Sequence, residues 1–195
     1  DGRKTVTRRP LKVEPRIDNC GNFIVGDRNY GQDINGNPQT KAFTDFHAPC
    51  RAGDLIWVRE TFCLGRLDEV DAEHPADRTL FIDQGCGNEY CIQKEWAVYK
   101  GVEELDEVKW KPSIHMPRKS SRLTLRVTDV RCERVQKMNK VDAVNEGFDL
   151  SNVLGFPRVW FKDVWNSIYS NWDQNPWVWV IEFEVIKKNV DGVAK

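Results

Sequence analysis

The sequence predicts an α+β fold, a barrel-like domain of mostly antiparallel strands with flanking helices. Several segments alternate apolar and polar residues as strands do, and two others have the apolar spacing of helices. The strands and helices do not alternate regularly, which argues against a parallel βαβ fold. At 195 residues the chain is long enough to bury a core without a disulfide or a metal. We therefore expect a single domain.

The strongest strand signal is the segment 177–186, where every second residue from Trp177 is apolar while Glu182 and Glu184 point the other way. Segment 122–130 predicts a half-buried strand, with Leu123, Leu125 and Val127 on one face and Thr124, Arg126 and Thr128 on the other. Shorter strands are expected at 55–58, 78–83 and 96–99.

Two helices are predicted. Asn139 has the position of an N-cap with Asp142 three residues later, and Gly147 has that of the glycine that ends a helix. The second helix, at about 158–170, has an apolar stripe made of Trp160, Phe161, Val164, Trp165 and Ile168. The stretch 19–37 is rich in Gly, Asn and Asp, and predicts a long loop or a flexible hairpin.

Charge is segregated along the chain although the net charge is only −1. Residues 66–107 carry twelve acids and four bases, while residues 109–140 carry ten bases and two acids. A basic face would suit the phosphates of a nucleic acid, but the two kinds of segment could equally pair with each other in the fold. We expect one domain over 1–188, with an acidic insertion at about 66–107 and a flexible tail at 189–195.

The composition limits the cellular setting. The longest apolar run has five residues, Trp177–Ile181, whereas a bilayer-spanning helix needs about 20. The first residues are charged, so no signal peptide is expected, and six cysteines are too few for a disulfide scaffold. These features favour a cytoplasmic protein with no membrane partner.

Metal and cofactor sites are not expected. Cys86-x4-Cys91 and His47-x2-Cys50 come nearest to ligand spacing, but neither is a Cys-x2-Cys pair. Cys63 and Cys132 are predicted to be buried thiols. The sequence also lacks a P-loop, a dinucleotide fingerprint and the common metalloprotease and serine-hydrolase motifs.

Several blocks, in order, resemble the ASCH domain of the PUA-like superfamily. They are Gly2-Arg3-Lys4-Thr5-x-Thr7-x-Arg9, Gly53-Asp54-x-x-Trp57-Val58-Arg59-Glu60, Asp142-Ala143-x-x-x-Glu146-Gly147 and the closing Val180-Ile181-Glu182-Phe183. The block 110–118, Trp110-Lys111-Pro112-Ser113-Ile114-His115-Met116-Pro117-Arg118, is similar to that of longer bacterial and phage members, some of which are labelled morphogenetic proteins. The resemblance implies a PUA-like β-barrel with flanking helices and a cleft that binds RNA or a nucleoside.

In small bacterial members of this family a Lys, a Thr and a Glu remove the acetyl group from N4-acetylcytidine, and the matching residues here are Lys4, Thr7 and Glu146. A threonine hydroxyl becomes a good nucleophile only when a base takes its proton. A lysine serves as that base only when burial or neighbouring cations lower its pKa. Strand alternation puts Lys4 and Thr7 on opposite faces, so a turn at Thr5 would be needed. We expect the three to converge in one hollow edged with positive charge.

We also expect substrate or nucleic-acid contacts from Arg3, Arg8, Arg9, Arg59, Glu60, Trp110, Ser113, His115 and Arg118. Core packing is the alternative for Trp110, a structural hydrogen bond for His115, and a structural ion pair for Arg59 and Glu60. Other interpretations stay open, because this chain is nearly twice as long as the small amidohydrolases. The basic residues would bind phosphate in a non-catalytic RNA-binding module. Alternatively, a phage accessory protein would act through protein contacts, with the acidic insertion as its interface. The sequence does not determine the oligomeric state.

Overall fold

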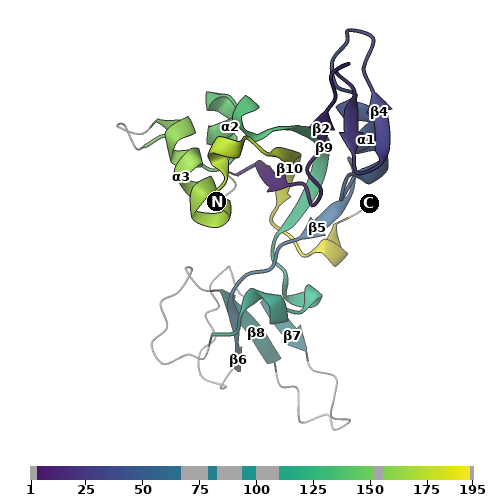
Figure 1. Ribbon diagram of the computed structural model, residues 1–195. Helices are drawn as coiled ribbons and strands as arrows, with labels where there is room; N and C mark the ends of the chain where they lie inside the picture. The colour runs from purple at the N-terminus through teal and green to yellow at the C-terminus, as the bar shows by residue number, and fades with distance from the viewer. Residues whose placement is uncertain (1–3, 67–78, 83–93, 100–109, 152–155, 194–195) are drawn as a thin grey trace. The chain divides into compact units, whose positions relative to one another are not determined.

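The computed structural model describes residues 4–66, 79–82, 94–99, 110–151 and 156–193, and the chain divides into two compact units (Figure 1). Unit 1 comprises residues 1–54 and 126–184, and unit 2 comprises 55–125 and 185–195. The fold is α+β, with an antiparallel sheet curled into a half-barrel, which confirms the predicted class at this level. No described helix has both the length and the apolar composition needed to span a bilayer.

The sheet of unit 1 has the strand order β1 (Val6–Pro10), β10 (Trp177–Ile186) and β9 (Thr124–Arg134). In the antiparallel pair β1–β10, Thr7 lies opposite Ile181, and Arg9 lies opposite Trp179. Residues that face each other in this way point to the same side of the sheet. The register therefore gives β1 two distinct faces, each of which continues onto β10.

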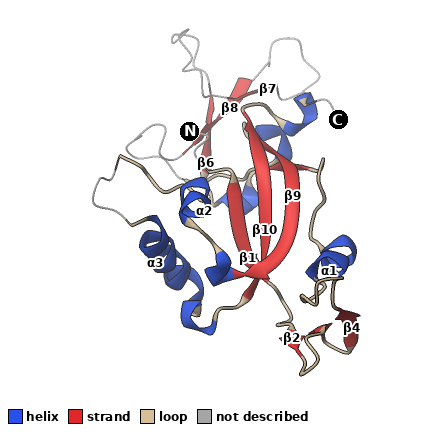
Figure 2. Ribbon diagram, turned by 90° about the horizontal axis from the view of Figure 1, so that it is seen from above, coloured by secondary structure: helices blue, strands red, loops and turns tan. Residues whose placement is uncertain are grey.

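One face is covered by α2 (Lys140–Asn145) and α3 (Pro157–Tyr169), and we call it the helix side (Figure 2). Val6, Val178 and Val180 pack there against Phe161 and Trp165 in a single buried cluster. Burying each of these side chains contributes roughly 1.5–3 kcal/mol. The helix side therefore supplies much of the stability of unit 1.

The opposite face is covered by a small sheet and a helix, and we call it the meander side (Figure 2). The strands β2 (Arg16–Ile17), β3 (Phe23–Val25) and β4 (Arg28–Gly31) form the sheet, and α1 (Thr40–His47) follows. Phe23 packs edge-on against Trp177, and Phe43 stacks on Trp179 with ring centroids 5.1 Å apart. Both faces of β10 are thus buried, as far as Ile181.

Two similar loops frame the meander. The Asp18 carboxylate accepts hydrogen bonds from the backbone amides of Cys20 and Asn22. In the loop after β4, the Asp33 carboxylate likewise accepts hydrogen bonds from the backbone amides of Asn35 and Asn37. The side-chain hydrogen bond from Asn22 is the main cause of the lowered pKa of Asp18. The predicted loop or hairpin at 19–37 is therefore a set of short strands held by carboxylate-centred turns.

Unit 2 contains β5 (Leu55–Trp57) and a three-stranded antiparallel sheet in the order β6 (Phe62–Arg66), β8 (Lys94–Tyr99) and β7 (Thr79–Ile82). Phe62 and Met116 are buried together, and Trp57 packs against them. The block 110–118 forms an extended stretch with the 3₁₀ turns Ser113–His115 and Arg118–Ser120. Most of the acidic stretch 66–107 lies outside the described residues.

The predicted elements agree with the structure except in their details. The strand 177–186 and the capped helix after Asn139 are confirmed, and Asn139 and Asp142 form a reciprocal capping box. Thr124, predicted on a polar face, is fully buried, and its hydroxyl is satisfied there by a hydrogen bond to the Lys188 carbonyl oxygen. Ile168, predicted in the apolar stripe, is 59% exposed. At the expected tail, Val190 is buried in a short 3₁₀ turn (Val190–Gly192).

Candidate functional site

Two of the three residues predicted to be catalytic meet on the helix side. The Lys4 ammonium donates to Glu146 Oε2 at 2.9 Å, and Arg8 donates to Glu146 Oε1 at 3.1 Å. The Glu146 side chain is only 2% exposed, whereas that of Lys4 is 50% exposed. A buried carboxylate thus holds one accessible cation and one buried cation. We call Lys4, Arg8 and Glu146 the lysine cluster.

The end of α2 positions this cluster. Glu146 is the C-cap residue, and Gly147 follows with a φ of 110°, a conformation that favours glycine. A Cβ on Gly147 would lie 3.6 Å from the Lys4 Cβ, so the chain passes close to Lys4 at this point. The Thr5 amide also donates to the Asn145 carbonyl oxygen at 2.8 Å. The N-terminal segment is therefore tied to the last turn of α2 by backbone as well as side chains.

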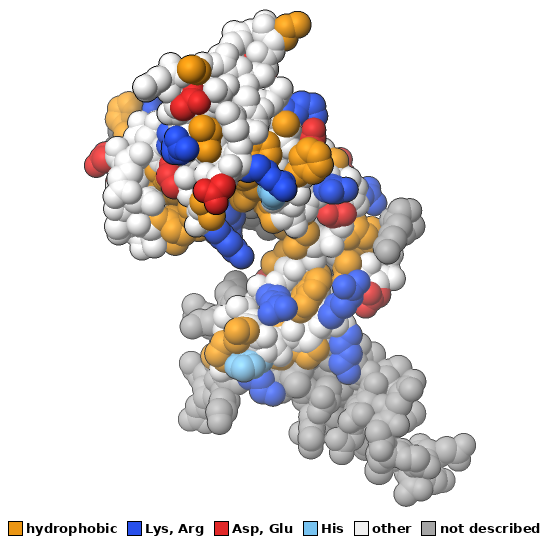
Figure 3. Space-filling model, turned by 45° about the vertical axis from the view of Figure 1, so that its right-hand side comes forward, with side chains coloured by type: hydrophobic (Ala, Val, Ile, Leu, Met, Phe, Trp, Pro, Cys, Tyr) orange, Lys and Arg blue, Asp and Glu red, His pale blue; other side chains and the backbone are white. Residues whose placement is uncertain are grey.

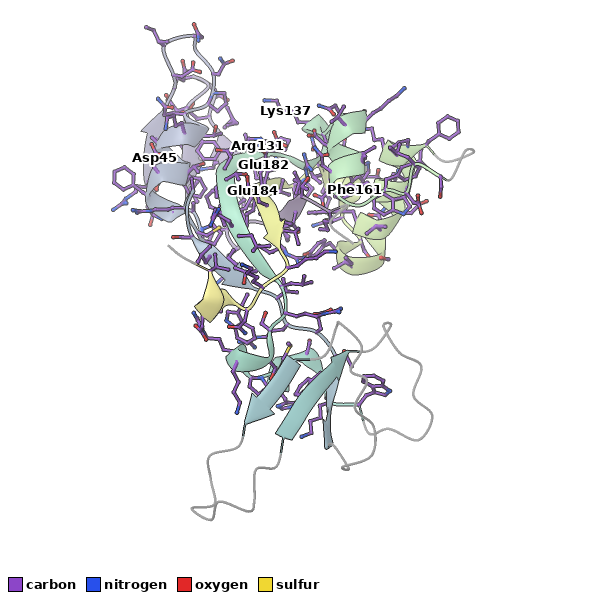
Figure 4. The ribbon with its side chains drawn as sticks, turned by 180° about the vertical axis from the view of Figure 1, so that it is seen from behind. Asp45, Arg131, Lys137, Phe161, Glu182 and Glu184 are labelled. Carbon is purple, nitrogen blue, oxygen red and sulfur yellow. The ribbon has the colours of Figure 1, made fainter. Side chains whose placement is uncertain are left out.

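Carboxylates surround Arg8. Its guanidinium, which is fully buried, also lies 3.1 Å from Glu133 and 3.3 Å from Asp142. Arg131 extends the network on the same sheet face, since it pairs with Glu133 and Glu182, and Figure 4 shows it beside Glu182. With Lys4 and Glu146 included, these residues comprise four carboxylates and three cations. The expectation of a positively edged hollow is wrong at this place, because acidic side chains from β9 and α2 converge on Arg8.

Thr7 does not lie in the lysine cluster. The strand β1 is regular from Val6, whose side chain is in the core of the helix side, and Arg8 points to that same side. Thr7 pairs with Ile181 and points to the meander side. No turn at Thr5 intervenes, because the Thr5 carbonyl oxygen still accepts a sheet hydrogen bond from Phe183. The structure therefore brings Lys4 and Glu146 together and places Thr7 on the other face of the strand.

The remaining N-terminal arginines differ in their surroundings. Arg3 lies outside the described residues. Arg9 is exposed, and its guanidinium donates to the Tyr169 hydroxyl at 3.3 Å. Arg8, expected to contact a ligand, is instead the buried centre of the carboxylate network. Arg8 and Arg9, the two described arginines of this segment, thus have different surroundings: the first is buried among carboxylates and the second is exposed.

The other predicted contact residues belong to unit 2. The Arg59 guanidinium lies over the Trp57 ring, 4.7 Å from its centroid. The Nη1 atom of Arg59 is 3.5 Å from the Ile114 carbonyl oxygen. Glu60 accepts two hydrogen bonds of 2.9 Å from Arg122. No pattern in the sequence pointed to Arg122 as this partner, since Glu60 and Arg122 are far apart in the chain.

Within the 110–118 block, His115 is exposed and Ser113 and Trp110 are half-buried. Arg118 is exposed and paired with Asp191 at 2.9 Å. Figure 3 shows Lys and Arg side chains gathered among hydrophobic ones on unit 2, with few acidic side chains between them. We call Trp57, Arg59, Lys111, Ile114 and His115 the basic face. The Phe62 amide donates to the Lys111 carbonyl oxygen at 3.2 Å, and this hydrogen bond joins the 110–118 block to β6.

The described cysteines include one protected thiol. Burial, with a smaller effect of the Glu133 charge, raises the pKa of Cys132 to about 12. This confirms Cys132 as a buried thiol, whereas the side chain of Cys63 and all of Cys86 and Cys91 lie outside the described part. No grouping of three potential metal ligands occurs among the described residues.

Comparison with known proteins identifies no relative: no family model matches the chain, and neither a curated protein nor a solved structure matches it. The lysine cluster offers an accessible hydrogen-bond donor on a fixed carboxylate. The basic face offers a guanidinium on an aromatic ring.

Proposed function

We propose that this chain is an RNA-binding protein of the ASCH type, with a PUA-like fold, whose ligand is RNA or a modified nucleoside. The observation that carries the proposal is the exposed Arg59 guanidinium above the Trp57 ring. Guanidinium planes and aromatic rings both stack on unpaired bases, and the charge attracts the adjacent phosphate. Such a pair supports recognition of single-stranded RNA without sequence selectivity.

The surroundings of Arg59 keep its charge available. Glu60 is the neighbouring acid, and its carboxylate is already bonded twice by Arg122. No carboxylate of the described residues is paired with Arg59 or with the exposed Lys111. The basic face therefore presents cations whose counterions would be phosphates, which supports binding driven by release of salt ions.

Lys4 supports the same proposal from unit 1. Its ammonium is half exposed, and Glu146 fixes its position at 2.9 Å. A donor held in one place loses little freedom when it binds an acceptor such as a phosphate or a base oxygen. In this arrangement the Lys4 ammonium donates to Glu146 and is still half exposed, so it can donate a further hydrogen bond to a ligand.

Fluorescence anisotropy with a labelled 20-nucleotide single-stranded RNA tests the proposal. We expect Arg59→Ala to weaken binding by about tenfold, consistent with the roughly 1–3 kcal/mol that a stacking contact contributes. Lys111→Ala should lower the slope of log K against log salt by about one. Lys187→Ala removes an exposed cation of unit 2 outside the basic face and serves as the matched control. Wild-type protein without salt-sensitive RNA affinity would overturn the proposal and favour an accessory protein that works through protein contacts.

A second candidate is an amidohydrolase that acts on N4-acetylcytidine-like substrates, and the observation that favours it is the Lys4–Glu146 contact. This candidate requires the Thr7 hydroxyl to reach Lys4, although strand alternation places it on the meander side. Purified protein should release acetate from N4-acetylcytidine, and Lys4→Ala and Thr7→Ala should each stop the release. Turnover that is unchanged in both variants rejects this candidate.

A further inference from the structure

A pocket of about 1090 Å³ lies on the meander side of unit 1, across the sheet from the lysine cluster. Its walls come from the end of β1 and the residues after it, the β3–β4 hairpin, the C-terminal part of α1, and Trp179 and Ile181 of β10. The volume is slightly above the usual range of small-molecule sites, which is about 300–1,000 Å³. The sequence did not predict this pocket, because its walls meet only when the meander folds over the sheet.

Stacked rings form one wall. Phe43 is parallel to Trp179, with ring centroids 5.1 Å apart, and His47 stacks on Phe43 at 5.2 Å. Tyr30 meets Phe43 edge-on, and its hydroxyl shares a hydrogen bond of 2.6 Å with His47 Nε2. Phe43 and Trp179 are buried, whereas His47 is exposed and Tyr30 is half-buried. The buried rings of Phe43 and Trp179 therefore hold the more accessible rings of Tyr30 and His47 in a fixed orientation, where a planar ligand would meet them.

The rim of the pocket is positively charged. Lys12 and Arg28 are exposed, and neither has an ion-pair partner among the described residues. Arg9 adds a third cation, although its guanidinium is bonded to the Tyr169 hydroxyl. Asp27 is the one acid among the lining residues. The rim is therefore suited to bind an anionic group, and the aromatic wall is suited to stack on a planar ring.

We propose that this pocket is a nucleotide-binding site, in which the base packs against Tyr30 and His47 and the phosphate lies between Lys12 and Arg28. A nucleotide is the common ligand class that joins a planar aromatic group to a phosphate, and it therefore carries both of the groups that this wall and this rim would accept. The nucleotide is either a free mononucleotide or part of a short single strand, because the chemistry is the same. The inference goes beyond the proposed function, since the pocket shares no residue with the basic face or the lysine cluster.

Isothermal titration calorimetry with the four ribonucleoside monophosphates, the matching nucleosides and triuridylate tests the site. We expect at least one phosphorylated ligand to bind, and its nucleoside to bind at least about tenfold more weakly, because a charged hydrogen bond contributes about 1.5–3 kcal/mol. Binding of the monophosphate identifies a free nucleotide as the ligand, and binding of triuridylate alone identifies an RNA segment. Failure of every phosphorylated ligand to bind at millimolar concentration overturns the inference.

Paired variants separate the pocket from charge effects and from the RNA proposal. The double variant Lys12→Ala/Arg28→Ala should weaken nucleotide binding by at least about tenfold. The double variant Lys137→Ala/Lys140→Ala removes two exposed cations outside the pocket, and should bind as the wild type does. His47→Ala should weaken binding by about fivefold or more through lost stacking. Equal loss in both double variants would contradict the site. Arg59→Ala tests the RNA proposal and the Lys12→Ala/Arg28→Ala variant tests the pocket, so this inference and the RNA proposal can fail separately.

Discussion

Replacing Arg8 with methionine is expected to destabilise unit 1 strongly, because the guanidinium is the buried centre of three carboxylates. Two of these carboxylates keep other partners: Glu133 lies 3.6 Å from Arg131, and Asp142 accepts from the Asn139 amide at 2.9 Å. Glu146, 2% exposed, would keep Lys4 as its one cationic partner among the described residues. The substitution therefore leaves one buried charge short of a partner, which costs about 3–5 kcal/mol.

A milder change at the same contact gives the comparison. In Glu146→Gln, Arg8 retains Glu133 and Asp142, and the amide oxygen can still accept a hydrogen bond. We expect a loss of about 1–2 kcal/mol, because the single glutamine oxygen can keep only one of the two hydrogen bonds that the Glu146 carboxylate accepts from Lys4 and Arg8. Lys41→Met removes an exposed i,i+4 pair with Asp45, and should change stability by less than about 0.5 kcal/mol.

Urea denaturation followed by tryptophan fluorescence measures these differences in unit 1, where most of the tryptophans lie. The slopes of the transitions should match, so that the shift in midpoint reports the change in the free energy of unfolding. An Arg8→Met protein within about 1 kcal/mol of the wild type would refute the view that Arg8 holds buried charges in place. A Glu146→Gln loss as large as that of Arg8→Met would equally refute it.

Four further outcomes concern the cap of α2, the glycine that follows it and the cysteines. Asn139→Ala should lower the free energy of unfolding by about 0.5–2 kcal/mol, measured by urea denaturation, because it removes the side-chain cap of the Asp142 amide. Gly147→Ala should cost about 1–3 kcal/mol in the same assay, since a φ of 110° strains any residue with a Cβ. Iodoacetamide at pH 8, analysed by mass spectrometry, should label the exposed Cys20 and leave Cys132 unmodified, and labelling of both thiols would contradict the burial of Cys132. Because the folded-state pKa of Cys132 is raised from 9.0 to about 12, the folded state binds its proton more tightly, so stability should fall as the pH rises from about 9 towards 12.

Elements with a local signal were predictable, and those without one were not. The strand at 177–186 and the capped helix after Asn139 carry their pattern in adjacent residues. Helix α1 and strands β2–β4 are too short for periodicity to indicate them, and they are stabilised by contacts with residues far away in the sequence, such as Phe43 with Trp179. Ile168 shows the reverse case, because a residue in the helical stripe stays exposed when no part of the described chain packs over it.

The candidate site divides in the same way. The sequence indicated Lys4 and Glu146 by resemblance, and the alternation of β1 already put Thr7 on the other face. It gave no indication that Glu133 and Asp142 would join Arg8, because side chains more than a hundred residues apart in the chain meet only through the strand register and the packing of α2.

What the sequence alone determined is local: the α+β class, the two faces of each strand, the helix cap, and which residue types were present for chemistry. Only the tertiary structure decided which charges neutralise one another and which remain accessible. The physical reason is that an ion pair or a stacked ring depends on separations of a few ångströms across the fold, whereas periodicity and capping depend only on neighbours along the chain. Thus Arg8 became a buried structural cation, while Lys12, Arg28 and Arg59 remained exposed.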